Sequence, residues 1–394
     1  MKIQNHIVRK FDNSYVVWLE EYNQWIQLEE PAFIVFEEVF GGGGKGDGLP
    51  GYQVTGLPGG AVKKLIEKYG LEEGEAERFV KEIVEVFRGL KKPVEEKHKK
   101  DNLLEDKIAG ERITHTYKAN GVRVRFEFAT ELLEYYNHHP FAHLEVEDDE
   151  DADAIFRVYD SNGIHVLKQI EPLEQEWSDV EIPGLKRRIL IEFGNVIYKK
   201  DMSEWMSIIH GAVITNRKNA LILSSSSGSG KSTLAALLQK EGYELASDDY
   251  IPLEANSSLI YPFPAAFSVK AGSFELLSEF YPELKTTSER KYRLTNKSLR
   301  FLPPVHSKNF NYAAFPATHL IFVKYTPETD YKLTSLKIPE ALKTFTEEAW
   351  ISDNPNYAER FIDWFSGLKC YLLEYSDNER VVEEMGLLLG DDGP

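Results

Sequence analysis

The segment from Asn219 to Asp249 constrains this chain most, because three local patterns follow one another within it. Residues 220–223 form a short apolar run of the kind that makes a buried strand. Further along, leucines recur at helical spacing, at Leu234, Leu237 and Leu238. The turn between these two patterns reads Ser-Gly-Ser-Gly-Lys-Ser-Thr from residue 227 to residue 233. Glycines there let backbone N–H groups point inward at a helix N-terminus, which predicts a phosphate-binding loop.

The residue types in this loop indicate a nucleoside triphosphate with Mg²⁺. The expected nucleotide-binding residues are Gly228, Ser229, Gly230, Lys231, Ser232 and Thr233. Lys231 would reach the β- and γ-phosphates of ATP, and the Ser232 hydroxyl would bind Mg²⁺. The usual pattern G-x-x-x-x-G-K-[ST] has a glycine where this chain has Ser225, so a Ser/Gly-rich surface turn is the alternative. The strand before the loop and the helix after it favour the nucleotide site.

A pair of carboxylates, Asp248 and Asp249, follows the loop helix at the end of a short predicted strand, residues 243–246. Successive side chains of a strand diverge, so one carboxylate can face a metal ion while its neighbour faces an acceptor hydroxyl. Phosphoryl transfer needs both roles. An isolated Asp-Asp pair is commonly a turn or a helix cap. Its position one helix after the loop favours the catalytic interpretation.

The order of these motifs resembles the catalytic core of the HPr kinase/phosphorylase family. Ile209-His210-Gly211 is followed by a strand-like run at 212–215, by the loop, and by the segment from Gly242 to Asp249. A later stretch, Pro-Ala-Ala-Phe-Ser-Val-Lys-Ala-Gly from residue 264, is similar to the segment that follows the acidic pair in related proteins. The resemblance implies an α/β P-loop kinase domain of the HPr kinase/PEP carboxykinase type.

The resemblance also implies roles for individual residues. The implied catalytic residues are His210, Lys231, Asp248 and Asp249. Among them Asp249 would join Ser232 at the Mg²⁺ ion, and Asp248 would accept the proton of the acceptor hydroxyl. Two departures from the family are Thr233, where HPr kinases have glutamate, and the lack of a recognisable glycine-rich phosphorolysis segment. The implied relative is a divergent serine kinase that acts on a peptide or protein, such as a ribosomally made peptide precursor.

The N-terminal part predicts a small α+β domain at residues 1–92. Two strands, at 14–20 and 24–28, precede a helix that opens at Pro31 and two further helices. This order resembles the winged-helix-like PqqD domains, which recognise leader peptides. The resemblance implies that an extended peptide adds a strand to the edge of the strand pair, with Val17, Leu19 and Ile26 lining side-chain pockets. A glycine-rich loop at 41–60 is an addition to that pattern.

Two further domains are expected after a charged linker at 91–101. Residues 102–204 are predicted to be β-rich, and residues 205–394 interleave strands and helices as an α/β domain does. The strands expected in the β-rich part are residues 122–128, 155–159, 165–170 and 189–193, with an acidic loop at 145–153. The later elements expected are strands at 319–325 and 369–375 and helices near 339–350, 357–365 and 379–389.

Other polar residues are weaker candidates. Four cations that could hold phosphate or acceptor follow the acidic pair, at Lys270, Arg290, Lys291 and Arg293. Surface positions are the commoner place for such side chains. His138, His139 and His143 could imitate a metal site, but Pro140 interrupts their spacing on any one helical face.

Composition limits the partners and the compartment. The 394 residues carry a net charge of −18, which disfavours binding to nucleic acid or to an anionic membrane. Cys370 is the only cysteine, so no intramolecular disulfide and no cysteine zinc site is expected. The sequence shows no signal-like segment at its start and no apolar stretch of spanning length. These features predict a cytoplasmic protein, and they leave the oligomeric state open.

Two other functions remain open from the sequence. A small-molecule P-loop kinase also has an acidic motif after the first helix, although such enzymes begin near the loop and carry an arginine-rich lid. A nucleotide-gated regulatory or binding protein without catalysis is the second alternative, favoured by Ser225 and the added N-terminal domain. Asp248 beside Asp249 argues for chemistry instead.

Overall fold

The computed structural model describes residues 5–40, 58–92, 112–147, 150–161, 163–226, 228–292, 297–305 and 309–390. The chain divides into two compact units, one made of Met1–Glu96 with Leu336–Cys370 and the other of Lys97–Ser335 with Tyr371–Pro394. These units do not follow the three predicted ranges, because residues 336–370 join the N-terminal part. Most of the glycine-rich loop at 41–60 and of the linker at 91–101 lies outside the described residues, as do Ser227 and Arg293.

The first unit is built on an antiparallel sheet in the order β1-β2-β3. Its N-terminal elements are β1 (His6–Phe11), β2 (Ser14–Leu19), a 3₁₀ turn (Glu20–Tyr22), β3 (Gln24–Glu29), α1 (Glu30–Phe40), α2 (Gly59–Tyr69) and α3 (Glu73–Arg88). The elements added from later in the chain are α8 (Ile338–Phe345), β20 (Ala349–Ile351) and α9 (Pro355–Ser366). Strand β1 was not predicted from the sequence.

Both faces of this small sheet are covered, which explains why β2 is almost continuously apolar. Val17 and Leu19 are buried in a core shared with α1 and α3. Neighbouring side chains alternate in direction along a strand, and α8 packs against β2 and β3. The helix expected at 339–350 ends at Phe345, and Trp350 lies in strand β20 instead.

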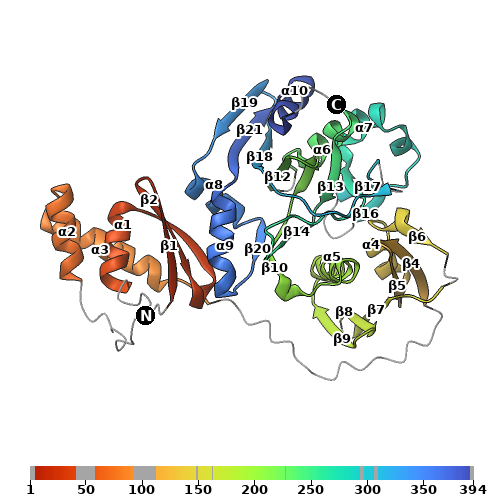
Figure 1. The fold of residues 1–394 in the computed structure, drawn as a ribbon, viewed down its shortest axis with the longest axis horizontal. Helices are drawn as coiled ribbons and strands as arrows, with labels where there is room; N and C mark the ends of the chain where they lie inside the picture. The colour runs from red at the N-terminus through yellow and green to blue at the C-terminus, as the bar shows by residue number, and fades with distance from the viewer. Residues whose placement is uncertain are drawn as a thin grey trace. The chain divides into compact units, whose positions relative to one another are not determined.

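The second unit contains a six-stranded sheet in the order β6-β4-β5-β7-β8-β9. Its elements are β4 (Ile113–Ala119), β5 (Val122–Phe128), α4 (Glu131–Asn137), a 3₁₀ turn (Ala142–Leu144), β6 (Glu145–Val146), β7 (Ala154–Ser161), β8 (Ile164–Glu171), β9 (Gln175–Asp179) and α5 (Ile182–Tyr198). Strands β5 and β7 are parallel, and the other described strand pairs of this sheet are antiparallel. Figure 1 shows α5 beside β8 and β9.

The strand predicted at 189–193 is wrong, because these residues lie inside α5. Buried positions of this helix recur at Leu185, Ile189, Phe193 and Ile197, which is the spacing of one helical face. Additional buried residues at Leu190 and Ile191 make the run look continuous, and a short continuous apolar run does not distinguish strand from helix. The same core includes Ile208, Tyr250 and Phe263 from beyond the predicted boundary at residue 204.

A second six-stranded sheet of this unit has the order β13-β11-β12-β18-β21-β19. Its strands are β11 (Ala212–Thr215), β12 (Ala220–Ser224), β13 (Glu244–Asp248), β18 (His319–Tyr325), β19 (Tyr331–Ser335) and β21 (Lys369–Tyr375). Helices α6 (Lys231–Lys240) and α10 (Asn378–Leu389) share one apolar core with it, and Figure 1 shows both helices beside its strands.

Shorter elements complete the second unit. They are a 3₁₀ turn (Met202–Glu204), β10 (Trp205–Ile209), β14 (Ile251–Glu254), β15 (Phe267–Lys270), a 3₁₀ turn (Ala271–Ser273), α7 (Phe274–Phe280), a 3₁₀ turn (Pro282–Lys285), β16 (Arg290–Tyr292) and β17 (Lys297–Leu302). Strands β10 and β14 pair antiparallel, and β15, β17 and β16 form a small sheet in that order. Among the described residues, no helix is long and apolar enough to cross a membrane.

Candidate functional site

Strand register brings the three sequence motifs to the same end of three neighbouring strands in the second sheet. Strand β11 lies between β12 and β13 and pairs antiparallel with both, so β12 and β13 run in the same direction. Ala212 is opposite Leu223 on one side and opposite Asp248 on the other. The start of β11 therefore lies beside the ends of the two strands. His210, the loop after Ser224 and the aspartate pair meet at these strand ends.

The loop turns sharply into α6 at two glycines. Gly228 has φ 100° and Gly230 has φ 101°, a left-handed region that glycine adopts without strain. Gly230 also lies close to other side chains, since a Cβ atom there would stand 3.2 Å from the Tyr375 hydroxyl. The loop is anchored to β18 because the Tyr325 N–H donates to the Ser229 carbonyl at 2.9 Å.

Lys231 begins the helix and is almost fully buried. Its ammonium group donates a hydrogen bond of 2.6 Å to the Ser225 carbonyl, so the lysine crosses the loop rather than extending into solvent. The Ser225 hydroxyl in turn shares a hydrogen bond with the Ser229 hydroxyl. Serine at the first glycine position thus contributes a contact inside the loop. The buried cation and the N-terminus of α6 favour an anion at the same place.

Asp248 is the most constrained carboxylate of the site. The Ser232 hydroxyl donates to its Oδ1 at 3.3 Å, and the Ser268 backbone N–H donates to its Oδ2 at 3.3 Å. Only 3% of the residue is exposed. Burial, followed by the charge of Asp249, raises the pKa of Asp248 from 3.8 to about 8. A carboxyl group with such a pKa can exchange a proton near neutral pH.

Asp249 and His210 face the open side of the site. Their side chains are 37% and 44% exposed, and His210 Nδ1 lies 3.8 Å from Asp249 Oδ1. The same nitrogen is 3.3 Å from the Asp249 carbonyl oxygen. Asp249 has φ 65°, and its N–H donates to the Gly211 carbonyl at 2.7 Å. The two strand pairs β10–β14 and β11–β13 are thus joined through the facing segments that contain His210 and Asp249.

Gly211 is required by the same junction. A Cβ atom at this position would stand 2.6 Å from the Leu223 carbonyl oxygen, which is a backbone atom that cannot move aside easily. The His-Gly order before β11 therefore has a packing reason. Thr233, where HPr kinases have glutamate, shares a 2.8 Å hydrogen bond with the Ser273 hydroxyl.

The structure divides the predicted site residues into a convergent group and outlying ones. The residues that meet at the strand ends are loop residues 228–233, Asp248, Asp249 and His210. Lys270 ends β15, two residues after Ser268, while Arg290 and Lys291 belong to β16. The Arg290 guanidinium lies 5.1 Å from the ring centre of Tyr135, and the Lys291 N–H donates to the Tyr135 hydroxyl. Sequence reasoning missed Ser268 because it acts through its backbone, which no residue type marks.

The three histidines of the 138–143 segment do not form one site. His138 lies with His115 and Glu145, whereas His139 and His143 both line a cavity of about 220 Å³. His143 Nε2 is 2.9 Å from the Pro264 carbonyl oxygen. Burial lowers the pKa of each of the three to about 4, so they are neutral at pH 7. His115 was not singled out from the sequence, because it lies far from His138 along the chain, and Glu145 was expected to belong to an acidic loop.

Comparison with known proteins does not extend these observations. No protein-family model matches the chain, and no curated protein matches it significantly.

Proposed function

We propose that the second unit is an ATP- and Mg²⁺-dependent kinase that transfers phosphate to a serine hydroxyl of a peptide or protein. The convergence of Lys231, Ser232 and Asp248 at the end of β12 and β13 carries this proposal. A glycine turn, a buried lysine and a helix N-terminus suit a triphosphate. A buried carboxyl group beside the loop serine suits the transfer step.

The residue types at the loop suit MgATP. Lys231 would exchange its bond to the Ser225 carbonyl for the phosphates, and Ser232 would turn its hydroxyl oxygen toward the metal ion. Apart from its chain neighbours, none of the described residues has an atom within 4 Å of the Cβ position of Gly228. Bound MgATP would supply the phosphoryl group and the positive charge that offsets its developing negative charge.

Asp248 is the best candidate for the group that accepts the proton of the acceptor hydroxyl. Its pKa of about 8 lies near the working pH, which is the condition for an effective general base. Asp249 and His210 are more exposed and lie where an acceptor chain or a metal ion could reach them. Because Asp248 also contacts Ser232, its contribution to metal binding has to be separated from its contribution to proton transfer.

A peptide acceptor is further supported by the first unit. Strands β1 and β3 are the edges of its three-stranded sheet, and an extended peptide can add to such an edge. A cavity of about 280 Å³ lies beside β3, lined by Trp25, Ile26 and Gln27 together with residues of α8. Such a cavity can hold a side chain of the bound peptide. We propose a cytoplasmic kinase whose acceptor is held by this unit.

The test is phosphate transfer from labelled ATP to serine-containing peptides, read by mass spectrometry. The parent protein should label a peptide, and Asp248→Asn should bind ATP with parent affinity but transfer phosphate about 10²- to 10⁴-fold more slowly. Equal transfer rates would exclude Asp248 as the base. If Asp248→Asn instead loses the Mg²⁺ dependence of ATP binding, Asp248 belongs to the metal ion and Asp249 faces the acceptor.

The same assay separates the competing functions. Labelling of a metabolite mixture but of no peptide would favour a small-molecule kinase. Saturable ATP binding without transfer to either class would favour a nucleotide-gated regulator.

A further inference from the structure

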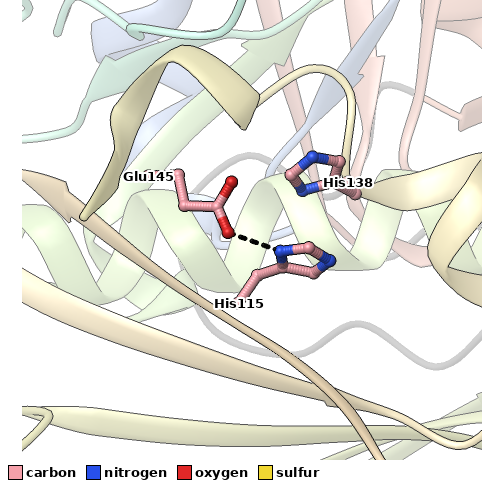
Figure 2. A group of neighbouring side chains, drawn as sticks. All are labelled: His115, His138 and Glu145. Atoms are coloured by element: carbon pink, nitrogen blue, oxygen red, sulfur yellow. Dashed lines mark hydrogen bonds and ion pairs between the residues drawn. The ribbon is translucent and has the colours of Figure 1, made fainter. Parts of the chain in front are cut away.

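We propose that His115, His138 and Glu145 bind one divalent transition-metal ion, and that Zn²⁺ is the ion that fits best. One ligand atom of each residue lies within 4.8 Å of those of the other two. The three residues come from β4, from the position directly after α4, and from the start of β6. Figure 2 shows the three side chains close together, with Glu145 bonded to His115 and the His138 ring stacked on the His115 ring at 4.0 Å between ring centres. This site is separate from the proposed nucleotide site and does not rest on it.

Each imidazole has a further polar group near one of its ring nitrogens. His138 Nδ1 lies 2.8 Å from the Tyr117 hydroxyl. His115 Nε2 lies 3.5 Å from Glu134 Oε1 and makes no hydrogen bond among the described residues. A histidine that binds a metal usually bonds a carboxylate or another polar group through its other nitrogen, which fixes the tautomer of the ring. Glu134 and Tyr117 are placed to provide this support.

The present contact between His115 and Glu145 shows what metal binding would change. His115 Nδ1 and Glu145 Oε1 are 2.6 Å apart, so one proton is shared between them. Two ligands of a tetrahedral Zn²⁺ ion at about 2.0 Å stand roughly 3.3 Å from each other. The metal ion would therefore displace this proton from Nδ1. The neutral His115 ring would then carry its single proton at Nε2, where it faces Glu134 Oε1.

The ligand set indicates the metal. Two imidazoles and one carboxylate suit Zn²⁺, which accepts such ligands with water in the fourth position. Mg²⁺ and Ca²⁺ prefer oxygen ligands alone. The side chain of His115 is only 16% exposed and that of Glu145 is 41% exposed, so an ion could enter from the Glu145 side.

An ordinary ion pair elsewhere in the same sheet provides the matched control. His165 Nδ1 and Asp160 Oδ1 are also 2.6 Å apart, and the His165 side chain is 19% exposed. Among the described residues, the only group of three metal-binding side chain types that meets the same distance is the one at His115. If a histidine–carboxylate pair alone bound the metal, both places would bind it.

The site would stabilise the segment between His138 and Glu145. Within this segment the Pro140 carbonyl accepts a hydrogen bond of 2.8 Å from the Ala266 N–H, and His143 contacts Pro264. Two residues after Ala266, Ser268 donates to Asp248. A metal ion at this place would act as a structural link next to the proposed catalytic carboxylate. Metal binding should therefore be measured by zinc affinity and melting temperature rather than by activity alone.

The experiment is a zinc titration of the full chain after dialysis against a chelator, with a chromophoric chelator as competitor. The parent should bind one Zn²⁺ per chain and melt at a higher temperature with zinc. Glu145→Gln and His115→Gln should each weaken binding at least tenfold and lose the zinc-dependent shift. Tyr117→Phe should weaken it about 10- to 100-fold, while His165→Gln should match the parent.

Cobalt absorption provides an independent readout, since Co²⁺ in a tetrahedral site with nitrogen ligands gives intense visible bands. Glu145 is exposed, so Glu145→Gln should fold normally and melt like the parent without zinc. The proposal is overturned if the parent binds no zinc at micromolar concentration. It is equally overturned if Glu145→Gln binds zinc as tightly as the parent and His165→Gln do.

Discussion

Asp248 combines burial with two hydrogen bonds, and this combination determines how it responds to pH. The carboxyl group ionises near 3.8 in an unfolded chain and near 8 in the folded protein, mainly because burial disfavours its charge. The folded state therefore binds more protons than the unfolded state between these two values. The contribution of Asp248 to stability is fully present below about pH 4 and is lost as the pH rises toward 8.

This pH dependence gives a prediction for Asp248→Asn, which keeps the shape of the side chain and removes the charge. The variant should gain stability relative to the parent between pH 5 and pH 8, by up to about 1.4 kcal/mol for each pH unit. Urea unfolding of both proteins at the two pH values measures the difference. A difference that is independent of pH would mean that Asp248 is already ionised in the folded protein at pH 5.

Residue types in the sequence were enough to select side chains that lie together in the fold. Lys231, Ser232 and the aspartate pair were selected because a phosphate loop would need these groups at fixed spacing. The sequence could not reveal that Ser232 lies against Asp248 rather than Asp249, because the direction of each side chain depends on strand register. Nor could it reveal the contacts of Tyr325 and Tyr375 with the loop, which come from distant strands.

At the scale of elements, the junction between β10 and β11 depends on the absence of a side chain at Gly211. Gly211→Ala would place a methyl group against the Leu223 carbonyl, so β11 and β12 must separate locally. We expect a loss of about 1–3 kcal/mol in the free energy of unfolding, and weaker nucleotide binding because the loop follows β12.

Gly272→Ala is the matched control, because no described residue other than its chain neighbours comes within 4 Å of its Cβ position and its φ is outside the left-handed region. Urea unfolding and calorimetric ATP binding of both variants make the comparison. Equal stability of Gly211→Ala and the parent would show that the junction tolerates a side chain and that the His-Gly order has no packing cause.

Strands and helices were predicted correctly where the pattern of apolar residues was clear. Strands β12, β18 and β21 and helices α9 and α10 lie close to their predicted positions. It failed for residues 189–193, where α5 is buried on more than one face and its helical period is hidden. Strand β1 was missed because its residues are mostly half-buried or exposed and alternate weakly.

At the scale of the whole molecule, the composition of the first unit could not be read from the order of the chain. Residues 336–370 are separated from the N-terminal domain by more than two hundred residues, yet both belong to one unit. Local patterns predict elements, but contacts between distant elements depend on tertiary packing. A deletion of residues 1–90 would therefore also remove the packing partners of α8 and α9, and a substitution is the sharper test of peptide binding.

The cavity beside β3 offers that substitution. Thr346→Trp should fill the cavity that Thr346 lines and weaken the binding of an extended peptide at least tenfold. Thr344→Trp places the same residue on an exposed part of α8 away from the cavity and should bind as the parent does. Fluorescence anisotropy of labelled candidate precursor peptides measures both affinities. Parent-like binding by both variants would contradict the proposed peptide site.

One calorimetric comparison would show whether Lys231 holds the phosphates of MgATP at the start of α6. The parent and Lys240→Ala, which changes an exposed lysine at the other end of the same helix, should bind one MgATP per chain with equal affinity. Lys231→Ala should bind it about 10- to 100-fold more weakly, because a charged hydrogen-bonding group is lost. Equal affinity of Lys231→Ala and the parent would contradict the account.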